Sequence, residues 1–248
     1  MASWWVSTFA AMADGSDPCV HALGCTLVVS IGLAVNAFFN HLAPASCRKD
    51  VFGSPLYSWR IGVIHQVILF PTCFLLAVCS TKTPLPTWSA WLNATWAELG
   101  TPWHALFHYI FFGYVAKDMT IPMALATQAH HMLCICLVVL SLLEWPQPCS
   151  ATFIAMSTIL ETGSCALSMN RQYPASRLLS TASLLVMSLS NAAASALALW
   201  YGAYFRHPTG HGETIAGRWA LPGVGFVLFY MRQDMEWKRW RSDHRKTQ

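Results

Sequence analysis

Two adjacent histidines, His130 and His131, lie inside an uncharged stretch that is long enough to cross a lipid bilayer. Residues 120–129 before the pair and residues 132–143 after it contain no Lys, Arg, Asp or Glu. Ionisable groups at such depth are costly, and membrane proteins normally keep them for a transport path or a site. An imidazole there could act as a general base, carry an acyl group transiently, or bind a lipid headgroup. The alternative is that both rings only hydrogen-bond to neighbouring helices.

Two further ionisable residues fall within other apolar stretches, namely His65 and Glu161, and Ser164 follows Glu161 by one helical turn. An ionised carboxylate cannot face lipid, so Glu161 must be paired, hydrated or protonated. It could orient and charge a histidine, or it could form a purely structural buried ion pair. We expect the pair His130 and His131 to be sheltered inside a helical bundle. The sequence leaves open whether all these groups meet in one cavity.

The composition predicts the membrane class of protein that must position these groups. Of the 248 residues, 55% are hydrophobic and only 10% are charged, whereas soluble domains carry about 25% charged residues. A chain of this length favours one compact all-α bundle over two domains. The net charge of +4 does not indicate nucleic-acid binding, because the basic residues fall in loops and at the end of the chain. The nine cysteines show no CxxC pairing and are interpreted as free thiols in apolar spans.

About seven transmembrane spans can be delineated, and six remain the alternative. The third is short, the second is interrupted by Pro71, and the seventh is broken by Pro222 and three glycines. The expected spans are 19–42, 59–79, 103–116, 120–143, 149–169, 178–205 and 216–231.

Lys and Arg are distributed unevenly between the two sides of this topology. One side collects twelve of the fifteen basic residues and the other only Lys82, Arg206 and Arg218. The positive-inside rule therefore predicts a cytoplasmic C-terminus and a lumenal or extracellular N-terminus. A glycosylation sequon at Asn93 falls on the predicted outer side, in agreement with this orientation. Residues 1–13 are interpreted as an interfacial segment, with a cleaved signal peptide as the alternative.

The chain carries an ordered set of short motifs between about residues 55 and 235. They are Trp59-Arg60 with His65, Gly113-Tyr114 with Asp118, His130-His131, Glu161-Thr162-Gly163-Ser164 and Asn170-Arg171. In their order and approximate separations these motifs resemble the TLC domain. This is the family of ceramide synthases, translocating-chain-associating proteins and smaller TLC-domain lipid regulators, and the chain's length is closest to the small members.

The resemblance implies a TLC-type transmembrane bundle over 55–235, preceded by an interfacial segment and first span (1–54) and followed by a basic cytoplasmic tail (236–248). If the protein is an enzyme, His130 and His131 would be catalytic. The supporting or lipid-binding residues would be His65, Glu161, Ser164, Asp118, Asn170 and Arg60.

The implied function is binding of membrane lipids, including sphingolipids, and control of membrane lipid composition. A ceramide-synthase-like N-acyltransferase, using acyl-CoA and a long-chain base as substrates, is the alternative. Ceramide synthases carry further polar positions after their histidine pair, whereas residues 132–143 are apolar here, so catalysis is left open. A transporter or channel with structural histidines is the second alternative.

No cofactor is expected, the partners are membrane lipids rather than nucleic acid, and a homodimer is an open alternative. The endoplasmic reticulum is the first expectation for localisation and the plasma membrane the second. Two His-x3-His pairs, His104 with His108 and His207 with His211, have the spacing of helical metal ligands. We interpret them as loop and interfacial histidines and predict no metal site.

Overall fold

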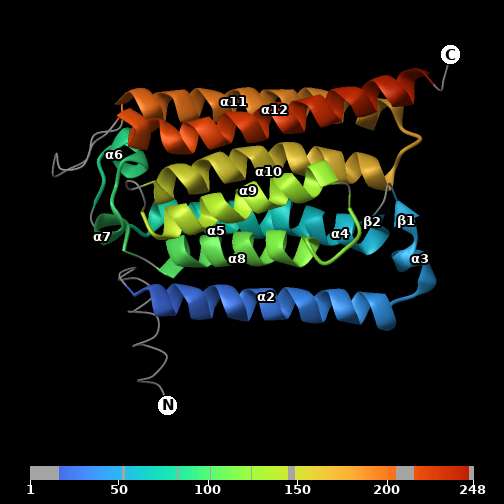
Figure 1. The fold of residues 1–248 in the computed structure, drawn as a ribbon, viewed down its shortest axis with the longest axis horizontal. Coiled ribbons are helices and arrows are strands. Elements are labelled where there is room, and N and C mark those ends of the chain that lie inside the picture. The colour runs from blue at the N-terminus through green and yellow to red at the C-terminus, as the bar shows by residue number, and fades with distance from the viewer. Residues whose placement is uncertain are drawn as a thin grey trace.

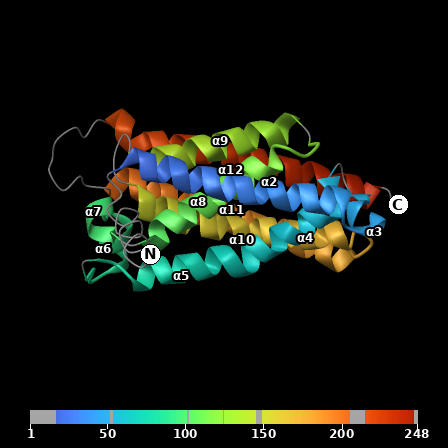
Figure 2. The ribbon, with the colours of Figure 1, turned by 90° about the horizontal axis from the view of Figure 1, so that it is seen from below.

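The computed structural model describes residues 17–51, 54–82, 84–100, 102–123, 125–144, 149–204 and 215–245. Within these ranges the chain is helical apart from turns and a two-residue antiparallel pair, β1 (Asp50–Val51) with β2 (Ser54–Pro55). Figure 1 shows long helices lying side by side in one bundle, and Figure 2 shows the same bundle turned by 90°. The prediction of an all-α protein is confirmed.

Long helical segments cross the bundle in alternating directions, and the described residues contain seven of them (Figure 1). They are α2 (Pro18–His41), the continuous segment α4–η1–α5 (Leu56–Ile64, His65–Leu69, Phe70–Cys79), α8 (Pro102–Asp118), α9 (Leu125–Leu142), α10 (Ser150–Gln172), α11 (Arg177–Tyr204) and α12 (Ile215–Arg245). The short α3 (Ala45–Arg48) lies at one end of the bundle with β1 and β2. The short α6 (Trp88–Leu92) and α7 (Trp96–Leu99) lie at the other end.

Four of the described segments are long and apolar enough to cross a membrane: Pro18–His41, Leu56–Cys79, Leu125–Leu142 and Arg177–Tyr204. Such helices indicate an integral membrane protein. The helices α8, α10 and α12 do not belong to this set, and their sequences explain why. The first has 17 residues, the second is rich in Ser and Thr, and the third ends in a charged stretch. In α10 most of the first half is buried, which lets a helix with polar residues occupy the centre of the bundle.

The sequence predicted that Pro71 and Pro222 would interrupt their helices, and this prediction is wrong for both. Helix α5 continues through Pro71, and the turn before it widens into the π-helical segment η1, in which the Phe70 N–H bonds to the His65 carbonyl. A π turn absorbs the missing donor and the bulk of a proline ring, and such turns recur at functional sites. Pro222 likewise lies inside the continuous helix α12. Neighbouring helices in a bundle stabilise helices that proline would break in isolation.

Small residues set the closest helix contacts. A Cβ built on Gly163 of α10 would lie 2.2 Å from Ser190 Oγ and 3.1 Å from Met187 Cα of α11. A Cβ on Gly113 of α8 would lie 2.5 Å from a methyl carbon of Val28 on α2. The start of the small-residue stretch 190–196 of α11 therefore packs closely against α10, as small residues do in many membrane bundles, whereas Ala192, Ala193 and Ala196 are exposed. The close approach at Gly163 fixes the position of α10, which carries Glu161, relative to α11.

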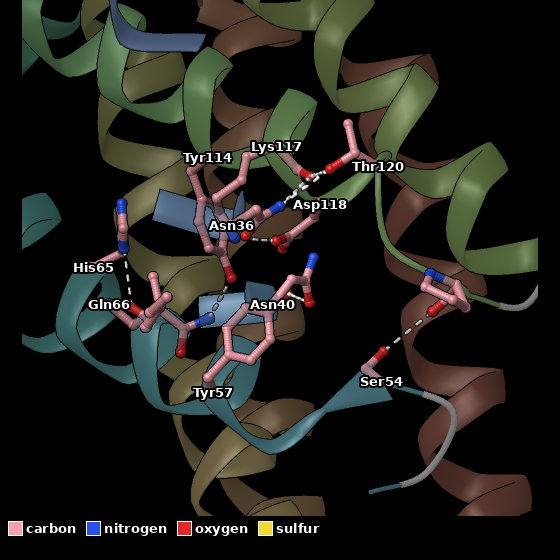
Figure 3. A network of polar contacts seen from close by, with 12 residues as sticks. Asn36, Asn40, Ser54, Tyr57, His65, Gln66, Tyr114, Lys117, Asp118 and Thr120 are labelled. Carbon is pink, nitrogen blue, oxygen red and sulfur yellow. Dashed lines mark hydrogen bonds and ion pairs between the residues drawn. The ribbon is translucent and has the colours of Figure 1, made fainter. Parts of the chain in front are cut away.

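A polar network joins four segments at the end of the bundle that carries α3 (Figure 3). The Asn36 amide of α2 donates to the Lys117 carbonyl (3.1 Å) and to Thr120 Oγ1 (3.0 Å) beyond α8. The Tyr57 hydroxyl of α4 donates to Asn40 Oδ1 (2.9 Å). Buried hydrogen bonds of this kind fix the relative register of the helices. The turn between α8 and α9 is thereby held at one end of the bundle.

Candidate functional site

A cavity of about 480 Å³ lies between α4, η1, α8, α9, α10 and α12. Its wall mixes polar side chains with apolar ones. The polar lining residues are Ser54, Ser58, Gln66, Tyr114, Asp118, Thr127, His130, His131, Glu161, Ser164, Ser168, Arg171, Arg232, Glu236, Lys238 and Arg239. The apolar lining residues include Phe111, Val115, Ile121, Met123, Leu167, Met187 and Met235.

The histidine pair lies inside the bundle, on the wall that α9 presents to this cavity. Both His130 and His131 line it, and their ring centroids are 5.7 Å apart with planes inclined at 51°. Neither Nδ1 atom has a hydrogen-bond partner among the described residues. The expectation of a sheltered pair is confirmed. The alternative in which both rings only bond to neighbouring helices is disfavoured, because the one hydrogen-bond partner found for the pair among the described residues, Cys134 Sγ at 3.7 Å from His130 Nε2, lies on the same helix.

Glu161 of α10 reaches the same cavity and is 7% exposed. Its Oε2 accepts a hydrogen bond of 2.9 Å from Gln66 Nε2, and the same Gln66 nitrogen lies 3.3 Å from the Tyr114 hydroxyl. The carboxylate is therefore held by an amide and not by an imidazole. Gln66 is itself 5% exposed, and its Oε1 atom has no partner among the described residues.

Arg232 of α12 is a component of the site that sequence reasoning missed. Its side chain is 6% exposed, lines the cavity and interacts electrostatically with Glu161. The guanidinium donates to Asn191 Oδ1 (3.2 Å), Ser164 Oγ (3.0 Å) and the Leu160 carbonyl (2.7 Å). One signal in the sequence could have indicated it. A buried Glu161 requires a positive partner, and Arg232 is the first basic residue after the apolar run of the seventh predicted span.

His65 does not line the cavity, although it is next to Gln66, which does. Its Nδ1 donates to the Ile61 carbonyl (2.9 Å), and its ring stacks on Tyr114 at 4.8 Å between centroids (Figure 3). Successive helical residues point in directions about 100° apart. Gln66, and not the neighbouring His65, therefore reaches Glu161.

The remaining predicted site residues separate into those on the cavity and those beside it. Asp118 and Ser164 line it, and Asp118 pairs with the buried Lys117. Asn170 is buried next to the cavity, and its amide oxygen accepts from the Arg239 guanidinium at 3.1 Å in the favoured amide orientation. Arg60 is exposed, and its guanidinium lies 3.8 Å from Cys47 Sγ, away from the cavity.

Basic side chains from α10 and α12 line the cavity towards the end of the bundle where α3 lies. Arg171 lies over the Trp59 ring at 5.8 Å, and Arg239 donates to Glu236 Oε2 at 2.7 Å. Lys238, which also lines the cavity, forms an exposed pair with Asp234. This side of the cavity therefore carries basic side chains, which attract anionic or zwitterionic groups.

The opposite end of the bundle is closed by packed histidines and aromatic rings. His104 and His108 are fully buried, which corrects the prediction that they are loop or interfacial residues. His108 donates from Nδ1 to the His104 carbonyl (2.7 Å), accepts at Nε2 from Ser141 (2.8 Å) and stacks on Phe153. Within the described ranges no group of three His, Cys, Asp or Glu side chains is arranged to hold a metal ion. His207 and His211 lie outside the described residues.

Two carboxylates lie near the start of α7, at the same closed end. Glu144 accepts from the Trp96 N–H at 2.6 Å, and Glu98 completes a capping box with Thr95. Burial raises the pKa of Glu144 to about 7. The bond from Trp96 lowers that pKa and the nearby Glu98 raises it. The sequon residue Asn93 caps α6 at this end, and its amide donates to the Ser89 carbonyl at 2.9 Å.

No protein family model, curated protein or solved structure matches this chain. The functional argument therefore starts from the cavity itself. The cavity can accept hydrogen bonds at Glu161 and Gln66, supply positive charge at Arg232, and offer two imidazoles for hydrogen bonding or proton transfer. Its apolar lining can contact a hydrocarbon chain.

Proposed function

We propose that this chain is an integral membrane protein of the TLC type that binds a membrane lipid, including sphingolipids, in the cavity and thereby influences membrane lipid composition. The observation that carries the proposal is that His130, His131 and Glu161, from two different helices, line one cavity. The order of these residues in the sequence is also what the TLC resemblance rests on.

The size and lining of the cavity support an amphiphilic ligand. Small-molecule sites typically enclose about 300–1,000 Å³ and are mostly apolar, with a few oriented polar groups. The cavity of about 480 Å³ falls in this range. A headgroup with hydrogen-bond donors would pair with Glu161 and with the unpartnered Gln66 oxygen. The start of a lipid chain would contact Phe111, Val115 and Leu167.

We further propose seven spans with the C-terminus in the cytoplasm and the endoplasmic reticulum as the membrane, with the plasma membrane second. The alternating directions of the seven long segments support this topology. The loops with Arg48, Lys49, Lys117 and Arg177 meet at one end of the bundle, which suits the cytoplasmic side under the positive-inside rule.

Lipid retention after purification tests the proposal. Gly62 lines the cavity, and a Cβ built on it would make only ordinary contacts, the nearest with Tyr114 at 3.4 Å. Gly62→Phe should therefore fill the cavity without removing any charge. Gly223→Phe is the matched control, because a Cβ there would have no heavy atom within 4 Å. Native mass spectrometry should find one lipid per chain in the wild type and in Gly223→Phe, but not in Gly62→Phe. Equal retention in all three contradicts a lipid in the cavity.

A second candidate is an N-acyltransferase, and the unpartnered Nδ1 atoms of His130 and His131 favour it. A ring nitrogen without a protein partner can accept a proton from an amine as a carbonyl is attacked. Purified protein supplied with a long-chain base and labelled acyl-CoA should then form an N-acyl product, and His131→Ala should abolish that product without loss of expression. Absence of product across acyl lengths, with lipid still retained, leaves lipid binding alone.

A transport function has less support from the geometry. The described residues at the end of the bundle opposite α3 include the packed His104, His108, Trp96 and Phe153. A water-filled path through that cluster would instead favour a channel or transporter.

A further inference from the structure

The absence of a side chain at Gly62 leaves a small polar space on the cavity wall, which we call the Gly62 niche. It is bounded by Gly62, Gln66, Tyr114 and Ser168, and all four residues line the cavity. A Cβ built on the glycine would lie 3.4 Å from the Tyr114 hydroxyl oxygen, 3.6 Å from Ser168 Oγ and 3.9 Å from Gln66 Oε1. Three oxygens from η1, α8 and α10 therefore converge on the space that a side chain at residue 62 would occupy.

The niche offers both hydrogen-bond acceptors and donors. Gln66 is 5% exposed, and its Oε1 atom has no donor among the described residues. The Tyr114 hydroxyl accepts from Gln66 Nε2 at 3.3 Å (Figure 3), and it carries a proton of its own to donate. The Ser168 hydroxyl can donate or accept. A ligand hydroxyl matches this set, because it both donates and accepts, and it would remove the cost of an unpaired buried amide oxygen.

The charges beside the niche do not suit a phosphate or an ammonium group. Gln66 Nε2 donates to Glu161 Oε2 at 2.9 Å, so a carboxylate lies next to the niche. Arg232 interacts electrostatically with that carboxylate, and its guanidinium already donates to three protein oxygens. A phosphodiester would add negative charge and has no proton to donate to Gln66 Oε1. An ammonium group could donate there, but it could accept nothing from the tyrosine or serine hydroxyl.

Further buried polar atoms without partners lie on other walls of the cavity. Glu236 of α12 is 3% exposed and lines the cavity, and its Oε1 atom has no donor among the described residues. On α9, the Nδ1 atoms of His130 and His131 also lack partners within the described ranges. Such atoms therefore occur on η1, α9 and α12, and a single hydroxyl cannot reach all three walls. A headgroup whose hydroxyls point to several sides, such as a sugar ring or glycerol, can pair with more of them.

We infer that the cavity recognises a neutral polyhydroxyl headgroup and that one hydroxyl of this headgroup occupies the Gly62 niche. That hydroxyl donates to Gln66 Oε1 and accepts from Tyr114 or Ser168. Gly62 is then a specificity-determining residue, because any side chain there takes the place of the hydroxyl. The inference rests on the proposed function, since it names the headgroup class of the lipid bound in the cavity.

Competition between lipids tests the inference on the full-length protein. Nanodiscs of phosphatidylcholine would contain equal mole fractions of a monohexosyl diacylglycerol and of phosphatidic acid. Native mass spectrometry of the released protein should find the hexosyl lipid enriched over the other two. An excess of methyl glucoside then distinguishes the two sources of the polyol. Displacement of the hexosyl lipid shows that the sugar alone is recognised, and its persistence shows that a glycolipid is required; both results keep the inference.

Two variants alter the niche and leave every charge in place. Gly62→Ala should lower the enrichment of the hexosyl lipid about three- to tenfold, the factor that corresponds to one hydrogen bond. Ser168→Ala should lower it in the same direction. Gly223→Ala and Ser195→Ala are the matched controls, because a Cβ on Gly223 has no heavy atom within 4 Å and the Ser195 hydroxyl donates to the Asn191 carbonyl of its own helix. Both controls should keep the wild-type enrichment.

Three outcomes overturn the inference: enrichment of phosphatidic acid, equal retention of the three lipids, and wild-type enrichment of the hexosyl lipid in both niche variants. Melting temperatures identify a variant that does not fold, and if Gly62→Ala is such a variant, Ser168→Ala decides. Failure of the proposed function gives a different result, in which the wild type retains no lipid of any kind. A protein that retains lipid without selecting the hexose keeps the proposed function and loses this inference.

Discussion

Replacement of Arg232 by methionine is the most direct perturbation of the polar site. Methionine keeps the apolar bulk of the side chain and removes the guanidinium. Asn191 Oδ1 and Ser164 Oγ would each lose a donor, and Glu161 would lose the positive charge with which it interacts. Removing one partner of a buried pair of charges typically costs about 3–5 kcal/mol, because the other charge is left uncompensated. We expect Arg232→Met to destabilise the protein by about this amount.

The assay is thermal unfolding of purified protein in detergent. For a chain of this size, about 3–5 kcal/mol corresponds to a fall in Tm of roughly 6–20 °C. Arg241→Met on the exposed part of α12 is the control. It removes only a guanidinium stacked on Trp237 at 4.7 Å, so it should cost less than about 1 kcal/mol.

A double-mutant cycle with Glu161→Gln isolates the interaction between the two charges. The double variant Arg232→Met/Glu161→Gln should be more stable than the sum of the single effects predicts, by about 1–3 kcal/mol. Strictly additive effects would mean that Glu161 and Arg232 do not interact across the cavity, and the electrostatic account of the site would then be wrong.

Three further predictions follow from other contacts. Gly163→Ala should destabilise the protein by about 1–3 kcal/mol, because the added Cβ would clash with Ser190 and the backbone of α11. Gly223→Ala should not, because the space around that Cβ is open. Equal melting temperatures of the two variants would refute the α10–α11 contact. Stability should fall as pH rises from about 4.5 to about 7, because the pKa of Glu144 in the folded protein lies above its ordinary value of 4.5 and the carboxyl group of the unfolded chain ionises first. Glu144→Gln should flatten this part of the curve of Tm against pH. An unchanged slope in the variant would contradict the prediction. Expression with microsomes should give an endoglycosidase-sensitive band that Asn93→Gln removes. If Asn93 is never glycosylated but a sequon engineered at the α3 end of the bundle is, the proposed orientation is reversed.

The helices could be predicted from the sequence because their apolar runs are long and nearly free of charge. All seven expected spans overlap a long helical segment, and the sheltered position of His130 and His131 followed from the cost of exposing imidazole to lipid. The ends and the prolines were less predictable. Pro71 is accommodated by the π turn η1, and α12 extends to Arg245 because Arg232, Glu236 and Arg239 find partners inside the bundle. Such partners come from distant segments, which local patterns do not report.

The composition of the cavity was predicted in part. Glu161 and Ser164 were identified because a carboxylate in an apolar span requires a partner, but the partner helix could not be deduced from spacing. The sequence indicated His65, whose side chain is ionisable, whereas in the structure Gln66 donates to Glu161.

Density for a bound amphiphile in the cavity is the measurement that tests the central claim most directly. Electron cryomicroscopy of the wild-type protein in lipid nanodiscs, with a bound antibody fragment to add size, would supply it. The account predicts an elongated density whose polar end lies between Glu161 on α10 and His130 and His131 on α9. A map in which side chains fill this space, or in which the histidine pair faces the surrounding lipid, would contradict the account.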